Sequence, residues 1–563
     1  MIRWLDIVVS VLYIAVILAI GLWVGVSHRK KSAGKTAGEY FLAGKTLRWP
    51  AIGLALFATN ISTVHLVSLA QSGFDTGLLN GDFEWMAAFT LILLALFFVP
   101  FYIRSGVATL PDFLEKRYDR DSRDWLVIVS IVSAIIIHIA FSMLAGGIVL
   151  KTLFGVSLYT SVIAISVITA VYTIVGGLKA VVVTESIQTV VLITGACVIS
   201  YACWHRMGGW LPLKEVLAHR GEMNKLSMLR PQGDGSGMPW YAVLLGYPVL
   251  GIWYWCADQT HVQRVLGAHS LKEGQNGALF AGFLKITPVF LMVFPGVIGY
   301  VLWQRGAIHL TNTPGTAHPD YNTMLSQLIL YLIPVGVRGL IAASLAAALM
   351  SCMAAALNSC ATIISIDVVK RLHPQATDAR VVRVGRITTG VIMVLAMLWS
   401  TQGDQFGTIF EAINKIPMTF APAVTTVFVF GVLWKRGTRQ AAMATLYFGT
   451  LIGVIYFLVD LPSTGRWFLP SSRLTDFGGF VTDPVQGLGV PFMLAGPIIA
   501  VVCVAIYVIT SLLTPAMDEA EVSKVCWDHP LAFLQGPVTA LSDPRIISLL
   551  LLATVGVSYY LLR

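Results

Sequence analysis

The sequence predicts an all-α, polytopic membrane protein with about fourteen transmembrane helices. Of its 563 residues, 56% are hydrophobic and only 12% are charged, about half the charged fraction of a typical soluble domain. A helix needs about 20 consecutive apolar residues to cross a bilayer, and many such stretches follow one another here. Stretches such as 88–103 (AFTLILLALFFVPFYI) have no polar face to offer water, which excludes a soluble enzyme with an unusually apolar core.

The predicted spans follow one another along the whole chain, with short polar loops between them. The first is longer than the apolar part of a signal peptide and no small-residue cleavage pattern follows it, so we expect it to be retained. The ninth, 329–367, is too long for one straight crossing, so part of it must project into water or break. The spans are predicted near 6–26, 50–72, 83–104, 125–150, 158–177, 180–203, 239–260, 276–303, 329–367, 384–402, 407–434, 440–459, 489–513 and 545–562.

The basic residues lie in loops rather than in one patch, so the net charge of +9 does not indicate a nucleic-acid-binding surface. By the span count, four basic clusters fall on one side of the membrane, whereas the loops near 75–80 and 403–406 on the other side contain no Lys or Arg. The long loop at 205–237 is an exception, with five basic residues. Because positive loops stay cytoplasmic, we predict that both termini face outward. The four clusters lie at 27–49, 116–123, 370–386 and 435–439.

Two spans are interrupted by residues that do not suit a continuous membrane helix. Residues 55–74 (ALFATNISTVHLVSLAQSGF) place amide, hydroxyl and imidazole groups in mid-span, and we predict a break around 59–62. The span at 239–260 contains Pro248 between two glycines and ends in the polar residues of CADQT. Paired interrupted helices in corresponding positions of two halves are the best sequence indication of a transporter's binding site.

Eight further segments occur in an order that is typical of one transporter family. They resemble the sodium/solute symporter family and, within it, the sodium/glucose cotransporter branch. The resemblance covers essentially the whole chain, and WYWCADQ and FEWMAA are its most specific parts. The segments are YFLAGKTLRW (40–49), NIS (60–62), FEWMAA (83–88), LPDFLEKRY (110–118), VYTIVGGLKAVVVTESIQ (171–188), WYWCADQTHVQR (253–264), GFLKITPVFLMVFPG (282–296) and AALMSCMAAALNS (347–359).

The resemblance implies a fold and an activity. The fold is a LeuT-type core of two inverted repeats of five helices, with one extra span before it and three after it. This divides the chain into 1–49 (first span and cytoplasmic loop), 50–237 (first repeat and outer loop), 238–434 (second repeat) and 435–563 (three further spans). The activity is sodium-driven solute uptake across the plasma (inner) membrane.

The resemblance also implies a solute site. An uncharged sugar needs several hydrogen-bonding groups from different helices and an aromatic wall for its ring. Tyr254 is additionally expected to act as the inner gate. Asn414 stands where relatives usually have the longer glutamine, so whether its side chain reaches the solute is undecided. Gly251 stands where some relatives have asparagine, which removes one possible contact with a sugar. The expected solute residues are Asn60, His65, Glu84, Tyr254, Trp255, Lys285 and Asn414.

Several of these residues can be interpreted without the family. An ionised side chain near mid-membrane costs about 2.5–3.5 kcal/mol on insertion scales, so such residues are functional by default. Lys285 lies deep in an apolar span, which favours a ligand site, with structural pairing as the alternative. Glu84 lies near the outer end of its span, where its carboxylate can be exposed to water. His65 follows the predicted break by one turn and is interpreted as a ligand, whereas His138, in an unbroken apolar run, is interpreted as core or as a helix–helix contact.

For sodium, a hard cation, the resemblance implies ligands at the first break. Sodium takes about five or six oxygens, and an unwound helix supplies free carbonyls. The matching positions are the carbonyls of Ala58, Ile61 and Ala348 and the side chains of Ser351 and Cys352. Most relatives have a hydroxyl in place of Cys352, and a neutral thiol is a weak ligand for a hard ion. The alternative for the last two is ordinary small-residue packing.

Two roles are possible for Glu185. Glu185 occupies a place where many relatives have an aspartate linked to cation coupling or to the inner gate. The alternative is that it pairs with a basic residue such as Lys179.

The sequence therefore predicts a sodium-coupled symporter of a sugar or polyol, glucose- or galactose-like, that works by alternating access. The alternatives are a symporter of another small solute (inositol, an amino sugar or a carboxylate) and a solute sensor that does not transport. An enzyme is not expected, because no nucleophile–base pair or metal cluster is evident. The expected partners are the solute, sodium and lipid but no nucleic acid, and a monomer suffices for transport.

Overall fold

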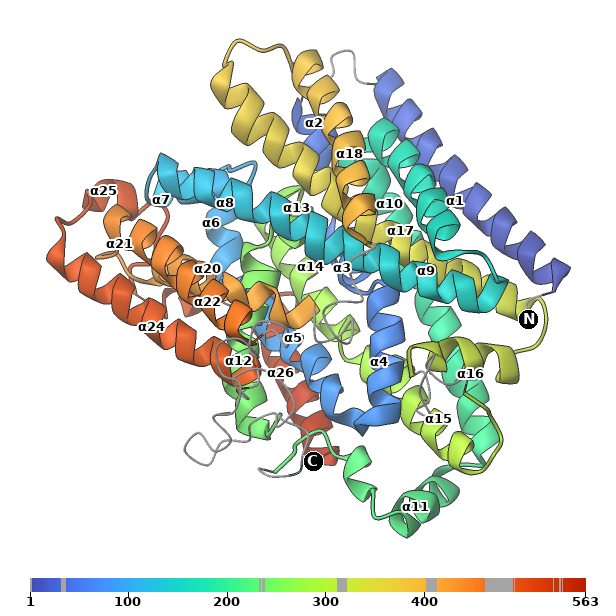
Figure 1. Ribbon diagram of the computed structural model, residues 1–563. Helices are drawn as coiled ribbons and strands as arrows, with labels where there is room; N and C mark the ends of the chain where they lie inside the picture. Colours follow the sequence, from blue (N-terminus) through green and yellow to red (C-terminus); the bar gives the residue numbers. More distant parts are fainter. Residues whose placement is uncertain are drawn as a thin grey trace.

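The computed structural model describes residues 3–31, 37–231, 238–310, 321–400, 413–460, 492–529 and 540–562, with a few isolated positions between them. Throughout these ranges the regular structure is helical (Figure 1), and the only β-pairing is an isolated bridge between Leu47 and Ala268. The prediction of an all-α protein is confirmed. Segments 401–412 and 461–489, which hold the loop at 403–406 and the start of the span at 407–434, lie outside the described residues.

The first half of the chain contains eleven α-helices among its described residues. They are α1 (Trp4–Lys31), α2 (Ala37–Leu42), α3 (Trp49–Asn60), α4 (Thr63–Asp75), α5 (Asp82–Leu93), α6 (Val99–Arg104), α7 (Leu110–Arg117), α8 (Arg120–Ser133), α9 (Phe141–Phe154), α10 (Leu158–Met207) and α11 (Trp210–His219).

The second half continues in the same way. Its helices are α12 (Trp240–Ile252), α13 (Gln259–Leu266), α14 (Leu271–Leu284), α15 (Phe294–Gln304), α16 (Met324–Leu332), α17 (Val337–Ile363), α18 (Asp378–Ser400), α20 (Ala421–Leu433), α21 (Arg439–Ala444), α22 (Thr450–Asp460), α24 (Phe492–Leu513), α25 (Glu519–Val522) and α26 (Pro544–Leu561). Short π-helical segments join or extend several helices, among them η4 (Ala134–Ala140), η6 (Trp253–Ala257) and η9 (Ile364–Lys370).

The number of crossings agrees with the predicted fourteen. In the described chain, ten helical stretches are long and apolar enough to cross a membrane, and two bent pairs raise the number to twelve. One of the ten is α10, whose 50 residues span about 75 Å at 1.5 Å per residue, more than twice the hydrocarbon thickness. It therefore makes two crossings. The broken helix formed by α12, η6 and α13 is a further crossing.

A glycine makes the fold within α10 possible. Gly177 has φ 62° and ψ −166°, a backbone conformation that is essentially restricted to glycine. A Cβ at this position would lie 2.6 Å from the carbonyl oxygen of Tyr40. The predicted boundary between the spans at 158–177 and 180–203 is thus confirmed at this residue.

The predicted long span at 329–367 also breaks. It is divided into α16 and α17, and the connection between them contains Gly336 with φ 90°. Asp6 in α1 stabilises this turn, because its carboxylate accepts the backbone N–H groups of Gly336 and Gly339 at 2.6 and 3.0 Å.

Contacts connect the four predicted basic clusters, whose common side of the membrane stays a prediction. Arg371 pairs with Asp124, which joins the loop after α17 to the start of α8. Arg386 lies over the ring of Tyr40 in α2. Arg117 donates to the carbonyl of Gly437. These contacts connect the clusters at 27–49, 116–123, 370–386 and 435–439.

The site is positioned by α17, which is almost entirely buried and rich in alanine. It packs against α10, α1 and α18. Small side chains allow helices to approach closely where lipid provides no hydrophobic driving force. Ser351, in the middle of α17, therefore reaches the backbone of α3.

Both predicted interruptions are present. Between α3 and α4 the backbone leaves helical geometry at Ile61 and Ser62, and the two helices are bent by 61°. In the second interrupted span the break lies at Asp258 (φ −94°, ψ 120°). Pro248, which suggested that interruption, lies inside α12. The glycine and proline pattern thus identified the broken helix, but the break itself is ten residues further on.

We expect Gly177→Ala to lower the stability of the folded protein much more than Gly155→Ala. Gly155 also has a positive φ of 69°, but no atom lies within 4 Å of a Cβ there. Its substitution should cost about 1 kcal/mol, and that at Gly177 about 3 kcal/mol or more, because strain and overlap add. Thermal unfolding midpoints of the purified variants in one detergent measure the difference. Equal midpoints would contradict this account of the fold in α10.

Candidate functional site

A cavity lies where the two broken helices meet, and all seven expected solute residues line it. About 810 Å³ between the lining residues is free of atoms, including the part open to solvent. The lining residues come from the α3–α4 break, α5, η4, α9, α12, η6, α17, the end of α14 and the segment before α20. The expected residues that line it are Asn60, His65, Glu84, Tyr254, Trp255, Lys285 and Asn414.

Lys285 is the centre of the polar part of the site. Its ammonium group forms an ion pair with Glu84 and donates to Oδ1 of Asn60 at 2.5 Å. Both charged residues are almost completely buried. The prediction that the carboxylate of Glu84 is exposed to water was therefore wrong. Lys285 is paired, as the structural alternative expected, and it also lines the cavity, so its role as a solute ligand stays a prediction.

The amide of Asn60 connects the two broken helices. Its Nδ2 donates to the hydroxyl of Tyr254 at 3.0 Å, which joins the end of α3 to η6. The same nitrogen lies 3.4 Å from Nε2 of His65, and Nδ1 of His65 lies 3.3 Å from Oγ of Ser62. His65 is thereby held toward the cavity as expected.

Aromatic rings form the apolar wall. Tyr254 and Trp255 meet edge to face with ring centroids 5.3 Å apart, and Phe83 and Tyr247 do so at 5.8 Å. The ammonium of Lys285 lies 5.8 Å from the ring centroid of Trp255. The cavity therefore combines a polar cluster without excess charge and a wall of rings.

The expected sodium ligands come together at the first break. Oγ of Ser351 lies 3.2 Å from the carbonyl oxygen of Ala58 and 2.8 Å from that of Ala348. Ile61 leaves helical geometry in the same region. Cys352 makes different contacts: its thiol lies 3.7 Å from the carbonyl oxygen of His138, and it accepts from Ser142 at 3.6 Å.

Glu185 forms a buried ion pair with Arg264, at 2.6 Å. The alternative that Glu185 pairs with a basic residue is confirmed, although the residue is Arg264 and not Lys179, and a role of Glu185 in coupling or gating stays a prediction. This pair joins α10 to α13, immediately beyond the second break.

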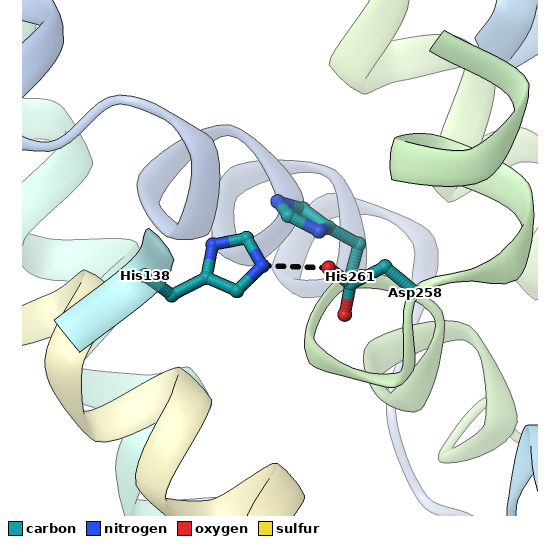
Figure 2. Close-up of side chains that lie close together, drawn as sticks. All are labelled: His138, Asp258 and His261. Carbon is teal, nitrogen blue, oxygen red and sulfur yellow. Dashed lines mark hydrogen bonds and ion pairs between the residues drawn. The ribbon is translucent and has the colours of Figure 1, made fainter. Parts of the chain in front are cut away.

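Sequence reasoning missed four residues at or beside the cavity. His138 was interpreted as a core residue, but it lines the cavity, and its Nε2 contacts Oδ2 of Asp258 at 2.6 Å (Figure 2). His261 lies next to this pair. The unbroken apolar run around His138 gave no sign of this role. Tyr247 and Ser142, which also line the cavity, were missed for the same reason.

Two membrane helices that unwind beside a cavity lined by polar side chains form the binding-site architecture of secondary transporters. The fold and the site thus define a membrane transporter rather than an enzyme.

Comparisons with known proteins identify the family. Residues 40–449 match the sequence profile of the Sodium:solute symporter family. The chain is 30% identical over 548 residues to sodium/glucose cotransporter 1 of Ovis aries, covering 93% of this chain and 80% of the relative. It is 32% identical to sodium/glucose cotransporter 4 of Mus musculus (93% and 77%) and 34% identical to sodium/myo-inositol cotransporter 2 of Sus scrofa (81% and 70%). The chain belongs to the sodium:solute symporter family.

Solved structures support the fold. A Na⁺-coupled sialic acid symporter in a substrate-bound outward-open state superimposes with a TM-score of 0.74 at 19% identity, covering 92% of this chain and 99% of that one. Mhp1, a nucleobase-cation-symport-1 family transporter in a closed conformation, gives 0.52 at 14% identity, with 88% and 98% covered. The expected LeuT-type architecture is confirmed, whereas the division at residues 49, 237 and 434 stays a prediction.

We expect Lys285→Met to destabilise the protein and Glu84→Gln in the same chain to restore most of the loss. Removing one partner of a buried pair leaves an uncompensated charge and costs about 3–5 kcal/mol, whereas replacing both partners is often nearly neutral. Thermal unfolding of the wild type, the two single variants and the double variant measures this. A double variant no more stable than Lys285→Met alone would show that the pair is not the source of the effect.

Proposed function

We propose that this chain carries a neutral polyhydroxylated solute, a hexose or a polyol, into the cell together with sodium. The observation that supports it best is the group formed by Lys285, Glu84 and Asn60. The lysine and the glutamate neutralise each other, so the cavity offers hydrogen bonds without requiring a charge on the solute. The neighbouring rings suit the apolar face of a sugar. The relatives are named for glucose and for myo-inositol, which are both of this class.

A carboxylate solute is the second candidate, and the contacts of Lys285 disfavour it. The ammonium already donates to Glu84 and Asn60, so an anionic solute would have to compete with Glu84.

Gly251, where some relatives have asparagine, does not leave open space. A Cβ there would lie 2.5 Å from the ring of Tyr247 and 2.9 Å from Thr90.

For sodium we propose the carbonyl oxygens of Ala58, Ile61 and Ala348 and the hydroxyl of Ser351 as ligands. Four oxygens from two helices approach the five or six that a hard cation takes. Cys352 adds a thiol, the weakest donor of the set for this ion. The ion would hold α3 at its break against α17, which links sodium binding to the position of Asn60 in the solute site.

The coupling energy is sufficient for accumulation of a solute. One sodium ion that enters across 100 mV releases about 2.3 kcal/mol, and a tenfold sodium gradient adds about 1.4 kcal/mol. At one-to-one coupling this supports at most about a few hundredfold accumulation of a neutral solute.

The gate and the membrane orientation complete the proposal. Tyr254 bonds to Asn60 from the second broken helix, and its separation from Asn60 would open the solute site toward α13. Glu185 and Arg264 would hold α13 against α10 during this movement.

We place the four connected basic clusters in the cytoplasm and the chain in the plasma (inner) membrane. Both termini would then lie outside, and the monomer would be the transporting unit.

We expect purified protein in liposomes to take up labelled glucose, galactose or myo-inositol, and to do so faster with an inward sodium gradient than with lithium or choline. The gradient is the only source of energy in this preparation. Equal uptake with all three cations would refute sodium coupling. Solute binding without uptake under any gradient would identify a sensor, and uptake of sialic acid or a carboxylate alone would refute the solute class.

We expect Cys352→Ser to lower the sodium concentration for half-maximal uptake, because a hydroxyl is a better ligand for a hard cation than a thiol. Cys352→Ala is the control, since it removes the donor, and it should not lower that concentration. Sodium dependence of uptake in liposomes measures both variants. An unchanged value in Cys352→Ser would show that the thiol is not a ligand.

A further inference from the structure

Two histidines and an aspartate, one from η4 and two from the second broken helix, meet beside the solute cavity. His138 lies in η4, Asp258 at the break of the second broken helix, and His261 in the first turn of α13 (Figure 2). All three are buried, and one ligand atom of each lies within 4.8 Å of those of the other two. His138 also lines the cavity, which connects the cluster to a space accessible to solutes.

Both carboxylate oxygens of Asp258 have hydrogen-bond partners, whereas the ring nitrogens of His261 have none among the described residues. Oδ1 of Asp258 accepts the backbone N–H of Thr260 at 2.7 Å, and Oδ2 contacts Nε2 of His138 at 2.6 Å. Both ring nitrogens of His261 are buried, and in the described part of the chain neither has a hydrogen-bond partner. A buried polar group without a partner is destabilising and indicates a water or an ion that completes the site.

The neighbouring rings hold His261 in place. Its ring centroid lies 4.0 Å from that of Tyr254, 5.2 Å from that of Trp255 and 5.6 Å from that of His138. The imidazole therefore cannot turn far away from Asp258 and His138. In Figure 2 its nitrogens lie on the side of the ring where these two residues are found.

We propose that His138, Asp258 and His261 form a binding site for a divalent transition-metal ion of the zinc class. Two imidazoles and one carboxylate are the protein ligands of many zinc sites, with a fourth position open to water. Imidazole nitrogens favour zinc and similar ions over sodium, calcium or magnesium. The ion would replace the hydrogen bond between His138 and Asp258 and would occupy the unused bonding capacity of His261. The open position would face the cavity next to His138.

The ion would bridge two parts of the transporter. It would fix η4 to the break at Asp258, and Tyr254 lies only four residues before that break. Movement of the second broken helix during transport would then require the ion to leave. A bound zinc ion is therefore inhibitory, a consequence that rests on the proposed function, whereas the metal site itself does not.

Zinc binding to the purified full chain tests the site without any transport. Equilibrium dialysis against Zn²⁺ followed by metal analysis should find about one ion per wild-type chain and a loss of that ion in His261→Gln. His373→Gln, at an exposed histidine after η9, is the matched control and should keep it. No bound zinc in the wild type, or equal binding in His261→Gln and the wild type, would overturn the proposal.

Cobalt in the wild-type protein provides a test that does not depend on the folding of a variant. Co²⁺ should give the visible absorption of a nitrogen- and oxygen-ligated ion, and Zn²⁺ should displace it. A thiolate charge-transfer band would place the ion on cysteines and overturn the assignment.

Uptake into liposomes then tests the inhibition. Zn²⁺ should slow solute uptake by the wild type and by His373→Gln. His261→Gln should raise the half-inhibitory concentration at least about tenfold, since even the loss of a hydrogen-bond partner of a metal ligand typically lowers metal affinity about 10–100-fold. Stoichiometric zinc binding in a protein that takes up no solute would support the metal site and count against the proposed function. Uptake that zinc inhibits equally in His261→Gln and in the wild type would overturn the inhibitory role.

Discussion

The structure depends on one constraint, which is that a peptide group inside a membrane must have a partner. An unwound helix exposes N–H and C=O groups, and each unsatisfied group costs several kcal/mol in hydrocarbon. The break at Ile61 and Ser62 is therefore possible only because protein surrounds it. The hydroxyl of Ser351 reaches the carbonyl oxygen of Ala58, and α17 excludes lipid from the gap. The same oxygens that would destabilise an isolated helix are available to a small cation.

Buried charges follow the same rule on a larger scale. The Lys285–Glu84 pair joins α14 to α5, Glu185 and Arg264 join α10 to α13, and Arg123 bonds to Asp367 in η9. Such pairs contribute little net stability compared with apolar packing, but breaking one leaves an uncompensated charge. They therefore define which helices stay together. Two of the three lie next to the broken helices, where the positions of helices relative to one another decide the geometry of the cavity.

Local helix irregularity contributes to the cavity, because two π-helical segments line it. The described chain contains six π-helical segments, and π segments within α-helices are frequent at functional sites. η4 presents His138 and η6 presents Tyr254 and Trp255 to the cavity. An extra residue in a helical turn changes the direction of the side chains that follow it. These segments thus bring polar groups of otherwise apolar helices to the site.

From the sequence alone we predicted the helical class, the number of crossings, the two broken helices and seven residues that line one cavity, and the role of these seven as solute ligands stays a prediction. Those features follow from apolar length, from polar groups in mid-span and from short motifs, all of which are local along the chain. The sequence did not show which side chains contact one another. Arg264 rather than Lys179 holds Glu185, and His138 meets Asp258 across 120 residues of sequence. Only the packing of helices decides such contacts, because an apolar run around a histidine looks the same whether its imidazole faces the core, lipid or a cavity.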